Sequence, residues 1–331
     1  MSTVKNAKQG LRFCQVVSLA LLFASCSKEE IPSFSIASGG ATGRYVVVGR
    51  ALARTVNENR AINGFQLENE RSSGSVSNIN AIAAGDTQFG IAQADHQYQA
   101  VKGSGEWKDK GPQENLRAVF SMYTESVTLL AGGDSDIRSI NDLKGKVVDI
   151  GSSGSGTQRN AIDALSAAGI DWKNDIQARE ESLDDRLAKF MEGELDAFFF
   201  TVGHPNIEIK FASYSVRGLR IIPLTNIDSL ISENPYLFRT SLPSKLYPRA
   251  YNEVDIETIG INATLLTSAK VSEDVVYAVT KTVFENLESL TESKTEFNAL
   301  LYDKFLEGLT APIHPGALKY YREIGLHIPS G

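Results

Sequence analysis

Cysteine is almost absent from this chain. The 331 residues include two cysteines, Cys14 and Cys26, and both lie near the N-terminus. From Ser27 onward there is no thiol, which excludes a disulfide, a thiol nucleophile and a cysteine-ligated metal site in the body of the protein.

An excess of basic residues is missing as well. The chain has 33 Lys and Arg against 40 Asp and Glu, a formal net charge of -7, and no block of clustered basic residues. Nucleic-acid binding relies on such a block to neutralise phosphates. We therefore expect no nucleic-acid partner. With 42% hydrophobic residues, the composition is that of a globular protein.

The sequence also lacks the common fingerprints of catalysis. Neither GxxxxGK[ST] nor GxGxxG occurs, which argues against a nucleotide cofactor. The nucleophile elbow GxSxG is absent, and the four histidines show neither HExxH nor another ligand spacing. These absences predict no cofactor, no metal and no enzymatic activity, and they favour a binding function.

What is present begins with an export signal. Lys5, Lys8 and Arg12 precede an apolar run over residues 13–24 that is short for a transmembrane helix. The run ends in Phe23-Ala24-Ser25-Cys26, which resembles a bacterial lipobox. We expect residues 1–25 to be a lipoprotein-type signal peptide, Cys26 to carry lipid and residues 26–33 to be a tether. The protein would then be exported and lipid-anchored to a membrane, on its periplasmic or cell-surface side.

From residue 34 onward, β-like runs alternate with amphipathic helical stretches, a pattern typical of an α/β fold with a mainly parallel sheet. Two long extended runs, residues 116–131 and 258–267, suggest two chain crossings between two domains with a ligand cleft between them. The predicted boundaries are 34–125 with 259–331 for domain 1, and 126–258 for domain 2. Residues 101–114 read as a mobile surface loop, and residues 272–309 as helical.

Three glycine- and hydroxyl-rich loops, residues 38–45, 72–76 and 151–157, each lie between a predicted strand and a predicted helix. Glycine lets the backbone approach a ligand, and the free amides of a helix start favour a carboxylate. Simple helix capping, with Thr42 as one capping residue, is the alternative explanation for each loop taken alone. Together they predict an anion-binding site to which both domains contribute residues.

Polar residues after other strands complete the candidate site. An acid such as Asp95 or Glu125 is suited to hold an ammonium group, and a tyrosine ring can cover a ligand; hinge and capping hydrogen bonds are the alternative. The candidate ligand-binding residues are Gly40, Thr42, Gly43, Arg44, Tyr45, Ser73, Gly74, Ser75, Gln93, Asp95, Tyr123, Glu125, Ser153, Ser155, Gly156, Thr157, Gly203 and His204.

At these loops the sequence resembles the TAXI-type solute receptors of tripartite ATP-independent periplasmic (TRAP) transporters. The likeness covers nearly all of the chain after the signal segment. It rests on motifs in the family's order, in residues 39–45, 74–79, 90–95, 122–125, 154–157, 196–200, 203–205, 275–277 and 313–321.

The resemblance implies a class II periplasmic-binding-protein fold that closes on a small anionic solute, such as glutamate or a related amino acid or dicarboxylate. It implies delivery of that solute to TRAP permease subunits by a receptor expected to be a monomer. The chain departs from the family at Arg44, where a small or apolar residue is usual; Arg44 then either meets a second ligand carboxylate or faces solvent.

Three other functions remain open on the sequence. The receptor could serve an ATP-driven transporter or a sensor instead of a TRAP permease. An exported enzyme could use His204 or His314 with a carboxylate. A surface adhesion lipoprotein would bind no small solute.

Overall fold

A computed structural model of the chain describes residues 31–40, 43–292 and 305–328. The chain divides into Met1–Ile31 and the compact unit Pro32–Gly331, and every element below belongs to the second unit. The predicted signal segment, Cys26 and Thr42 lie outside the described residues.

The first half of the sheet is built from three parallel strands whose connections are helices. Both β1–β2 and β1–β3 pair in parallel, as a strand–helix–strand succession requires. The elements are β1 (Ser33–Ala37), α1 (Arg44–Glu58), α2 (Arg60–Asn63), β2 (Gln66–Glu70), α3 (Ser75–Ala84), β3 (Phe89–Gln93), α4 (Ala94–Lys102) and the 3-10 turn η1 (Gly105–Trp107).

The second half repeats this plan. Its parallel pairs are β5–β6 and β5–β7. The elements are η2 (Ile140–Leu143), β5 (Val147–Asp149), α5 (Gly156–Ala167), β6 (Gln177–Arg179), α6 (Leu183–Glu192), β7 (Ala197–Val202), α7 (Ile207–Ala212), β8 (Leu219–Ile222), α8 (Asp228–Glu233), β9 (Leu237–Leu242) and η3 (Ser244–Leu246).

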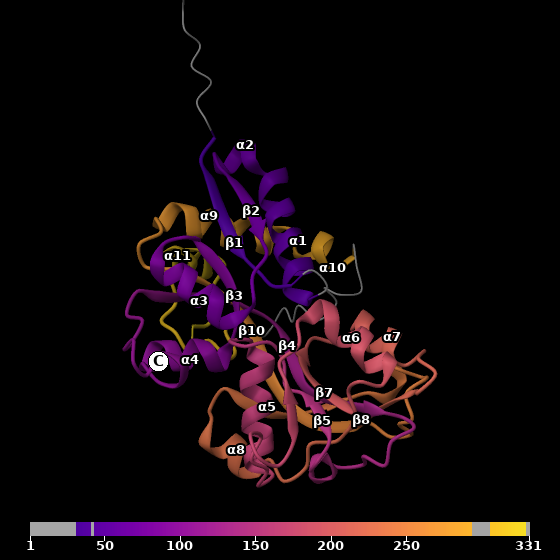
Figure 1. Cartoon of the computed structure of the whole chain (residues 1–331). Helices are drawn as coiled ribbons and strands as arrows, with labels where there is room; N and C mark the ends of the chain where they lie inside the picture. The colour runs from indigo at the N-terminus through magenta and orange to yellow at the C-terminus, as the bar shows by residue number, and fades with distance from the viewer. Residues whose placement is uncertain (1–30, 41–42, 293–304, 329–331) are drawn as a thin grey trace, which may run out of the picture. The chain divides into compact units, whose positions relative to one another are not determined.

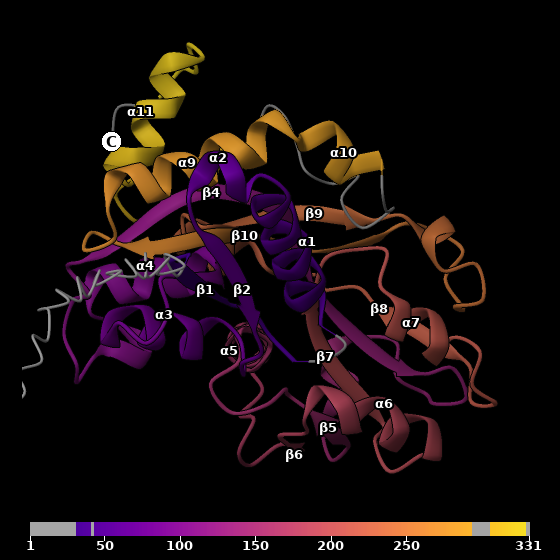
Figure 2. The same cartoon turned by 90° about the horizontal axis from the view of Figure 1, so that it is seen from above.

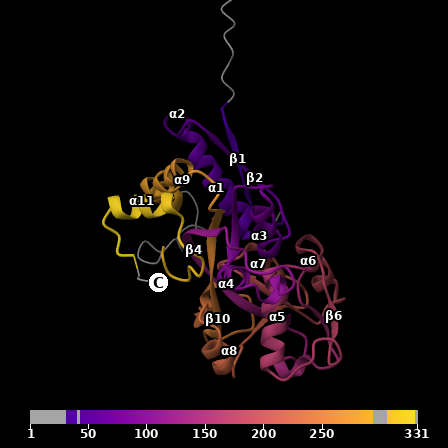
Figure 3. The same cartoon turned by 90° about the vertical axis from the view of Figure 1, so that its left-hand side faces the viewer.

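Two long antiparallel strands, β4 (Leu116–Gly132) and β10 (Ile256–Ser268), join the halves. Strand β10 pairs with β9 over residues 256–261 and with β3 over residues 263–267, so its neighbour changes at Asn262. The sheet order is β2-β1-β3-β10-β4-β7-β5-β6. Figures 1 and 3 show β10 running between the group around β1 and the group around α5.

Helices cover both faces of each half. In the first half, α1 and the C-terminal helices α9 (Glu273–Glu285) and α11 (Pro315–Glu323) form one core with β1 and β3, while α3 packs on the other face. The short helix α10 (Leu287–Glu292) follows α9. Figure 2 shows α9 and α3 on opposite sides of β10.

The strand β7 shows why these runs are largely apolar. Ala197 and Phe199 belong to the core on the α5 side, whereas Phe198, Phe200 and Val202 belong to the core on the α6 and α7 side. Side chains of a strand alternate between faces, so a strand covered on both faces needs no polar residue.

The predicted α/β class is confirmed, but the prediction of a mainly parallel sheet is wrong. Five strand pairs are antiparallel, β10–β3, β10–β4, β10–β9, β4–β7 and β4–β8, against the four parallel pairs given above. The reason is that β4 and β10 run antiparallel to their neighbours in both halves. A run of apolar residues does not reveal strand direction.

Two local predictions also need correction. Residues 101–114 are not simply a mobile surface loop, because they include the end of α4 and the turn η1, and Trp107 is fully buried. Within residues 272–309, helix is found to Glu292, and residues 305–308 form a turn. In the described part of the chain no helix has the length and apolar character to cross a membrane.

Replacing Trp107 tests the first of these corrections. The indole packs with Ile79 and Ala118, and its Nε1 donates to Asn80 Oδ1 at 3.1 Å. We expect Trp107→Ala to lower the free energy of unfolding by about 3–5 kcal/mol because it leaves a large cavity. Urea denaturation measures this, with Ile62→Ala at an 84% exposed position as control. Equal stability of the two variants would refute the anchoring role of Trp107.

Candidate functional site

The loops that leave the parallel strands of both halves meet at one place. The first half contributes the loops after β1 and β2 and the end of β3, and the second half contributes the loop after β5 and the end of β7. The carboxyl ends of parallel strands share one edge of a sheet, where open α/β folds bind ligands. Glu125, in the middle of β4, closes the bottom of the space between them.

A cavity of about 70 Å³ lies at this meeting point. A single water needs roughly 10–15 Å³ of such volume, so the cavity suits a small solute. Twelve of the predicted residues line it: Gly40, Gly43, Arg44, Tyr45, Ser73, Gly74, Ser75, Gln93, Glu125, Ser155, Gly156 and Thr157.

Gly39, in the predicted loop 38–45, also lines the cavity. Three further lining residues were not predicted from the sequence: Phe200, Thr201 and Val202. They end the buried strand β7 directly before Gly203. Their position immediately before a predicted site residue was the available signal. The largely apolar sequence of β7 instead indicated a position in the hydrophobic core, and Phe200 and Val202 do belong to that core.

Three helix N-termini point their partial positive charge at the cavity. The N-cap residues are Gly43 for α1, Gly74 for α3 and Ser155 for α5, and all three line it. Gly74 has φ 107°, a conformation that favours glycine. Ser155 Oγ accepts from the amide of Gln158, whereas the glycine caps have no side chain to offer. The amides of the first turns of α1 and α3 are therefore suited to an anion.

Arg44 adds a full positive charge. Its side chain is buried, its guanidinium carbon lies 4.8 Å from the ring centroid of Tyr123, and Nη1 lies 3.5 Å from the carbonyl oxygen of Pro205. A Cβ on Gly203 would lie only 2.7 Å from Arg44 Cδ, so glycine is needed for this close packing. Of the two orientations the sequence left open for Arg44, the structure has the one that lines the cavity.

Glu125 is the acid that lines the cavity, and it is protonated at neutral pH. Burial raises its pKa from 4.5 to about 8, although hydrogen bonds from Gln93 and Tyr45 and the charge of Arg44 oppose the shift. Its Oε2 accepts from Tyr45 Oη at 3.0 Å and from Gln93 Nε2 at 3.1 Å. The cavity thus combines a cation, three helix N-termini and an uncharged carboxyl.

The remaining predicted residues lie elsewhere. Asp95 is buried behind the cavity wall, where its oxygens bind His96 and Asn160. Tyr123 packs beneath Arg44, and burial raises its pKa well above 10. Ser153 is exposed and lines a neighbouring surface hollow with Ser73.

His204 belongs to a structural hydrogen-bond chain. Its Nδ1 lies 2.7 Å from Tyr247 Oη and its Nε2 lies 3.0 Å from Thr128 Oγ1. Because Tyr247 Oη also accepts from the amide of Asn206, it donates to Nδ1, and Nε2 carries the proton. Burial and the charge of Arg44 lower the pKa of His204 to about 3, so the ring stays neutral.

His314 has a comparable structural role. Its Nδ1 caps α11 by accepting from the amide of Gly316, and its Nε2 donates to the carbonyl of Val271. The enzymatic alternative requires His204 or His314 to pair with a carboxylate. In the hydrogen bonds given above, neither ring has a carboxylate as its partner. Among the described residues, no group of three or more His, Cys, Asp or Glu side chains is arranged to hold a metal ion.

Residues 36–325 match the NMT1-like family. The chain belongs to the NMT1-like family. Among solved structures, this NMT1-like chain is similar to the periplasmic binding protein BugD, with a TM-score of 0.55 and 12% identity over 90% of this chain and 94% of BugD.

A second similar structure is the alkanesulfonate-binding protein SsuA from Xanthomonas axonopodis pv. citri, bound to MOPS. Its TM-score is 0.51 and its identity 16%, over 90% of this chain and 84% of that one. The predicted fold is confirmed: the NMT1-like chain has the two-domain fold of periplasmic binding proteins.

The raised pKa of Glu125 predicts a pH-dependent stability. Between pH 4.5 and pH 8 the unfolded state releases a proton that the folded state keeps, so stability present below pH 4.5 is lost as pH rises to 8. Glu125→Gln has no such proton. We expect the variant to gain stability over the parent across this range, by on the order of a few kcal/mol.

Urea denaturation at several pH values measures the difference. Glu253→Gln, at an exposed position, is the control and should differ from the parent by a constant amount. A difference between Glu125→Gln and the parent that does not change with pH would show that Glu125 ionises normally.

Proposed function

We propose that this protein is an exported solute-binding protein that captures a small carboxylate in the described cavity and delivers it to a membrane transporter. The observation that carries the proposal is the convergence of three helix N-termini and Arg44 on a cavity whose acid, Glu125, is uncharged at neutral pH. Such a site is positive, although the whole chain has a net charge of -7.

Anion binding is favoured by each part of the site. Helix N-termini stabilise an adjacent negative charge by about 0.3–1 kcal/mol each, and by more when partly buried. Arg44 supplies a forked donor that matches a carboxylate. An ammonium group is bound most strongly by an ionised acid, and the Glu125 carboxyl supplies one only when it loses its proton. We therefore expect carboxylates without an ammonium group to bind more tightly than amino acids.

The solute would act by joining the halves. The N-termini of α1 and α3 belong to the first half and that of α5 to the second. A carboxylate that contacts both gains its full set of donors only when the halves are together. Binding would then favour the closed form, and the transporter would recognise that form. The proposed hinge is the β4–β10 pair, with domain boundaries near residues 125 and 259.

More specifically, we propose that the protein is a TAXI-type receptor that serves TRAP permease subunits, because its sequence motifs resemble those of that family. The fold it shares with BugD and with the alkanesulfonate-binding protein SsuA is compatible with other transporters, including ATP-driven ones. SsuA binds alkanesulfonates, which are also anions, so a sulfonate is the second candidate ligand.

A thermal-shift screen tests the proposed solute class on the chain from Ser27, which contains the whole compact unit. The panel includes glutarate, 2-oxoglutarate, L-glutamate and an alkanesulfonate. A ligand at about 100 times its dissociation constant adds about 2.7 kcal/mol of stability, a rise of several degrees. We expect a selective rise with a carboxylate, larger for 2-oxoglutarate than for L-glutamate.

Two variants locate the site. Arg44→Gln should abolish the rise because it removes the cation from the cavity. Arg54→Gln, on the same helix but exposed and paired with Glu58, should leave it unchanged. No shift with any compound, or an undiminished shift in Arg44→Gln, would count against the proposal.

The lipid anchor is tested separately. We expect the full chain to incorporate labelled fatty acid when expressed in a bacterium, and Cys26→Ser to abolish the label. Cys14→Ser, inside the predicted signal segment, is the matched control and should keep it. Loss of label in both variants, or in neither, would contradict acylation at Cys26.

A further inference from the structure

Asp95, predicted as a ligand contact, is instead bound on every side by protein. It is the second residue of α4 and is 1% exposed. Its Oδ1 accepts from the amide of His96 at 2.6 Å and lies 2.7 Å from His96 Nδ1. Its Oδ2 accepts from Asn160 Nδ2 at 2.8 Å. The carboxylate thus has no oxygen directed to a solute.

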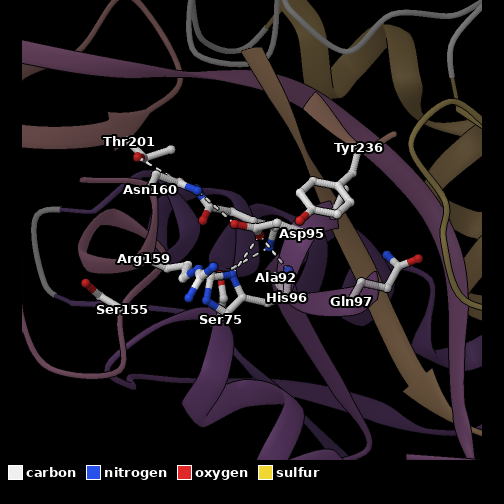
Figure 4. Close-up of polar contacts among 12 residues, drawn as sticks. Ser75, Ala92, Asp95, His96, Gln97, Ser155, Arg159, Asn160, Thr201 and Tyr236 are labelled. Carbon is white, nitrogen blue, oxygen red and sulfur yellow. Dashed lines mark hydrogen bonds and ion pairs between the residues drawn. The ribbon is translucent and has the colours of Figure 1, made fainter. Parts of the chain in front are cut away.

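Asn160 belongs to the second half of the molecule. It lies on α5, and its Oδ1 accepts from Thr201 Oγ1 at 3.0 Å, while the amide of Thr201 donates to Thr157 Oγ1 at 3.1 Å. Thr157 and Thr201 both line the cavity. Figure 4 shows Asn160 between Thr201 on one side and Asp95 on the other.

This chain of hydrogen bonds is buried along its length, with Asn160 4% and Thr201 7% exposed. A carboxylate that accepts a hydrogen bond in such surroundings forms a strong one, and a buried carboxylate that loses its donor is costly. Separation of α4 from α5 would deprive Asp95 of the Asn160 amide. The bond therefore favours the arrangement in which the two halves are together.

Two further contacts join the two halves near this bond. The ring of Tyr98, on α4, lies 5.2 Å from that of Tyr236, which precedes β9 in the second half. Gln93, just before α4, packs so closely on Gly156, at the start of α5, that a Cβ on Gly156 would overlap Gln93 Oε1. We call these two contacts and the Asp95–Asn160 hydrogen bond the seam between the two halves.

We propose that the Asp95–Asn160 hydrogen bond is a latch between the two halves, and that through Thr201 and Thr157 it sets solute affinity without touching the solute. Asp95 and Asn160 are then positioning residues. The effect on affinity rests on the proposed solute-binding function, whereas the effect on the arrangement of the halves does not.

The decisive variant is Asn160→Asp, which places two carboxylates face to face. At pH 7 their repulsion should separate the halves and weaken solute binding by about tenfold or more. At pH 5, protonation of one carboxyl restores a donor and should return affinity toward that of the parent. Glu125 stays protonated at both pH values, so it does not contribute to the difference.

The swapped pair Asp95→Asn with Asn160→Asp supplies the rescue. The amide introduced at position 95 can donate to the carboxylate introduced at position 160, which can still accept from Thr201. The swapped pair should therefore bind at pH 7 nearly as well as the parent. Other groups near the seam are His96, Arg159, Asp163 and Tyr236; all are unchanged in every variant. Asn115→Asp adds the same charge at an exposed position and should have no effect.

The arrangement of the halves is measured without solute. The chain from Ser27 has no cysteine, so Ile62→Cys on α2 and Met191→Cys on α6, both exposed, carry the only two spin labels. We expect a changed distance distribution in Asn160→Asp at pH 7, with return at pH 5 and in the swapped pair.

The outcomes separate the two proposals. An unchanged distance in a folded Asn160→Asp protein, or loss without rescue in the swapped pair, would overturn the latch. A distance that responds as expected while no compound binds would support the latch and refute the proposed solute class.

Discussion

The antiparallel pairing of β4 with β10 is the constraint on which the rest of this structure depends. The two strands pair from Leu116 with Ser268 to Val127 with Ile259, and each continues into the sheet of both halves. Because the neighbour of β10 changes at Asn262, one strand pair joins the two halves of a single sheet. The carboxyl ends of the parallel strands of each half are thereby brought to the same space.

That placement produces a local charge opposite to that of the whole chain. The chain is acidic, yet three helix N-termini and Arg44 surround the cavity. Burial keeps Glu125 protonated, so this acid on the cavity wall does not cancel the positive field. Net charge, which describes solubility and long-range attraction, says little about a buried site a few ångströms wide.

Strand–helix alternation, the glycine-rich loops and the two long extended runs were all recognisable in the sequence, because periodicity and turn residues are local properties. Twelve of the eighteen predicted site residues line one cavity. All except Glu125, which lies within β4, belong to a strand end, to the loop that follows it or to the first turn of the next helix. The direction of β4 and β10 was not recognisable, and it made the sheet mixed. Trp107 was predicted to lie in a surface loop because its neighbours in the sequence are polar, but its ring is buried.

The sequence by itself determined the α/β class, the loops at the strand ends and the absence of thiol chemistry, since each follows from residue type and short-range spacing. Tertiary structure decided which polar side chains face the cavity. Asp95 and Glu125 are both acids of the predicted site, yet one binds Asn160 across the halves and the other lines the cavity. It also decided their charge, because the pKa of a carboxyl depends on burial and on neighbours distant in the sequence.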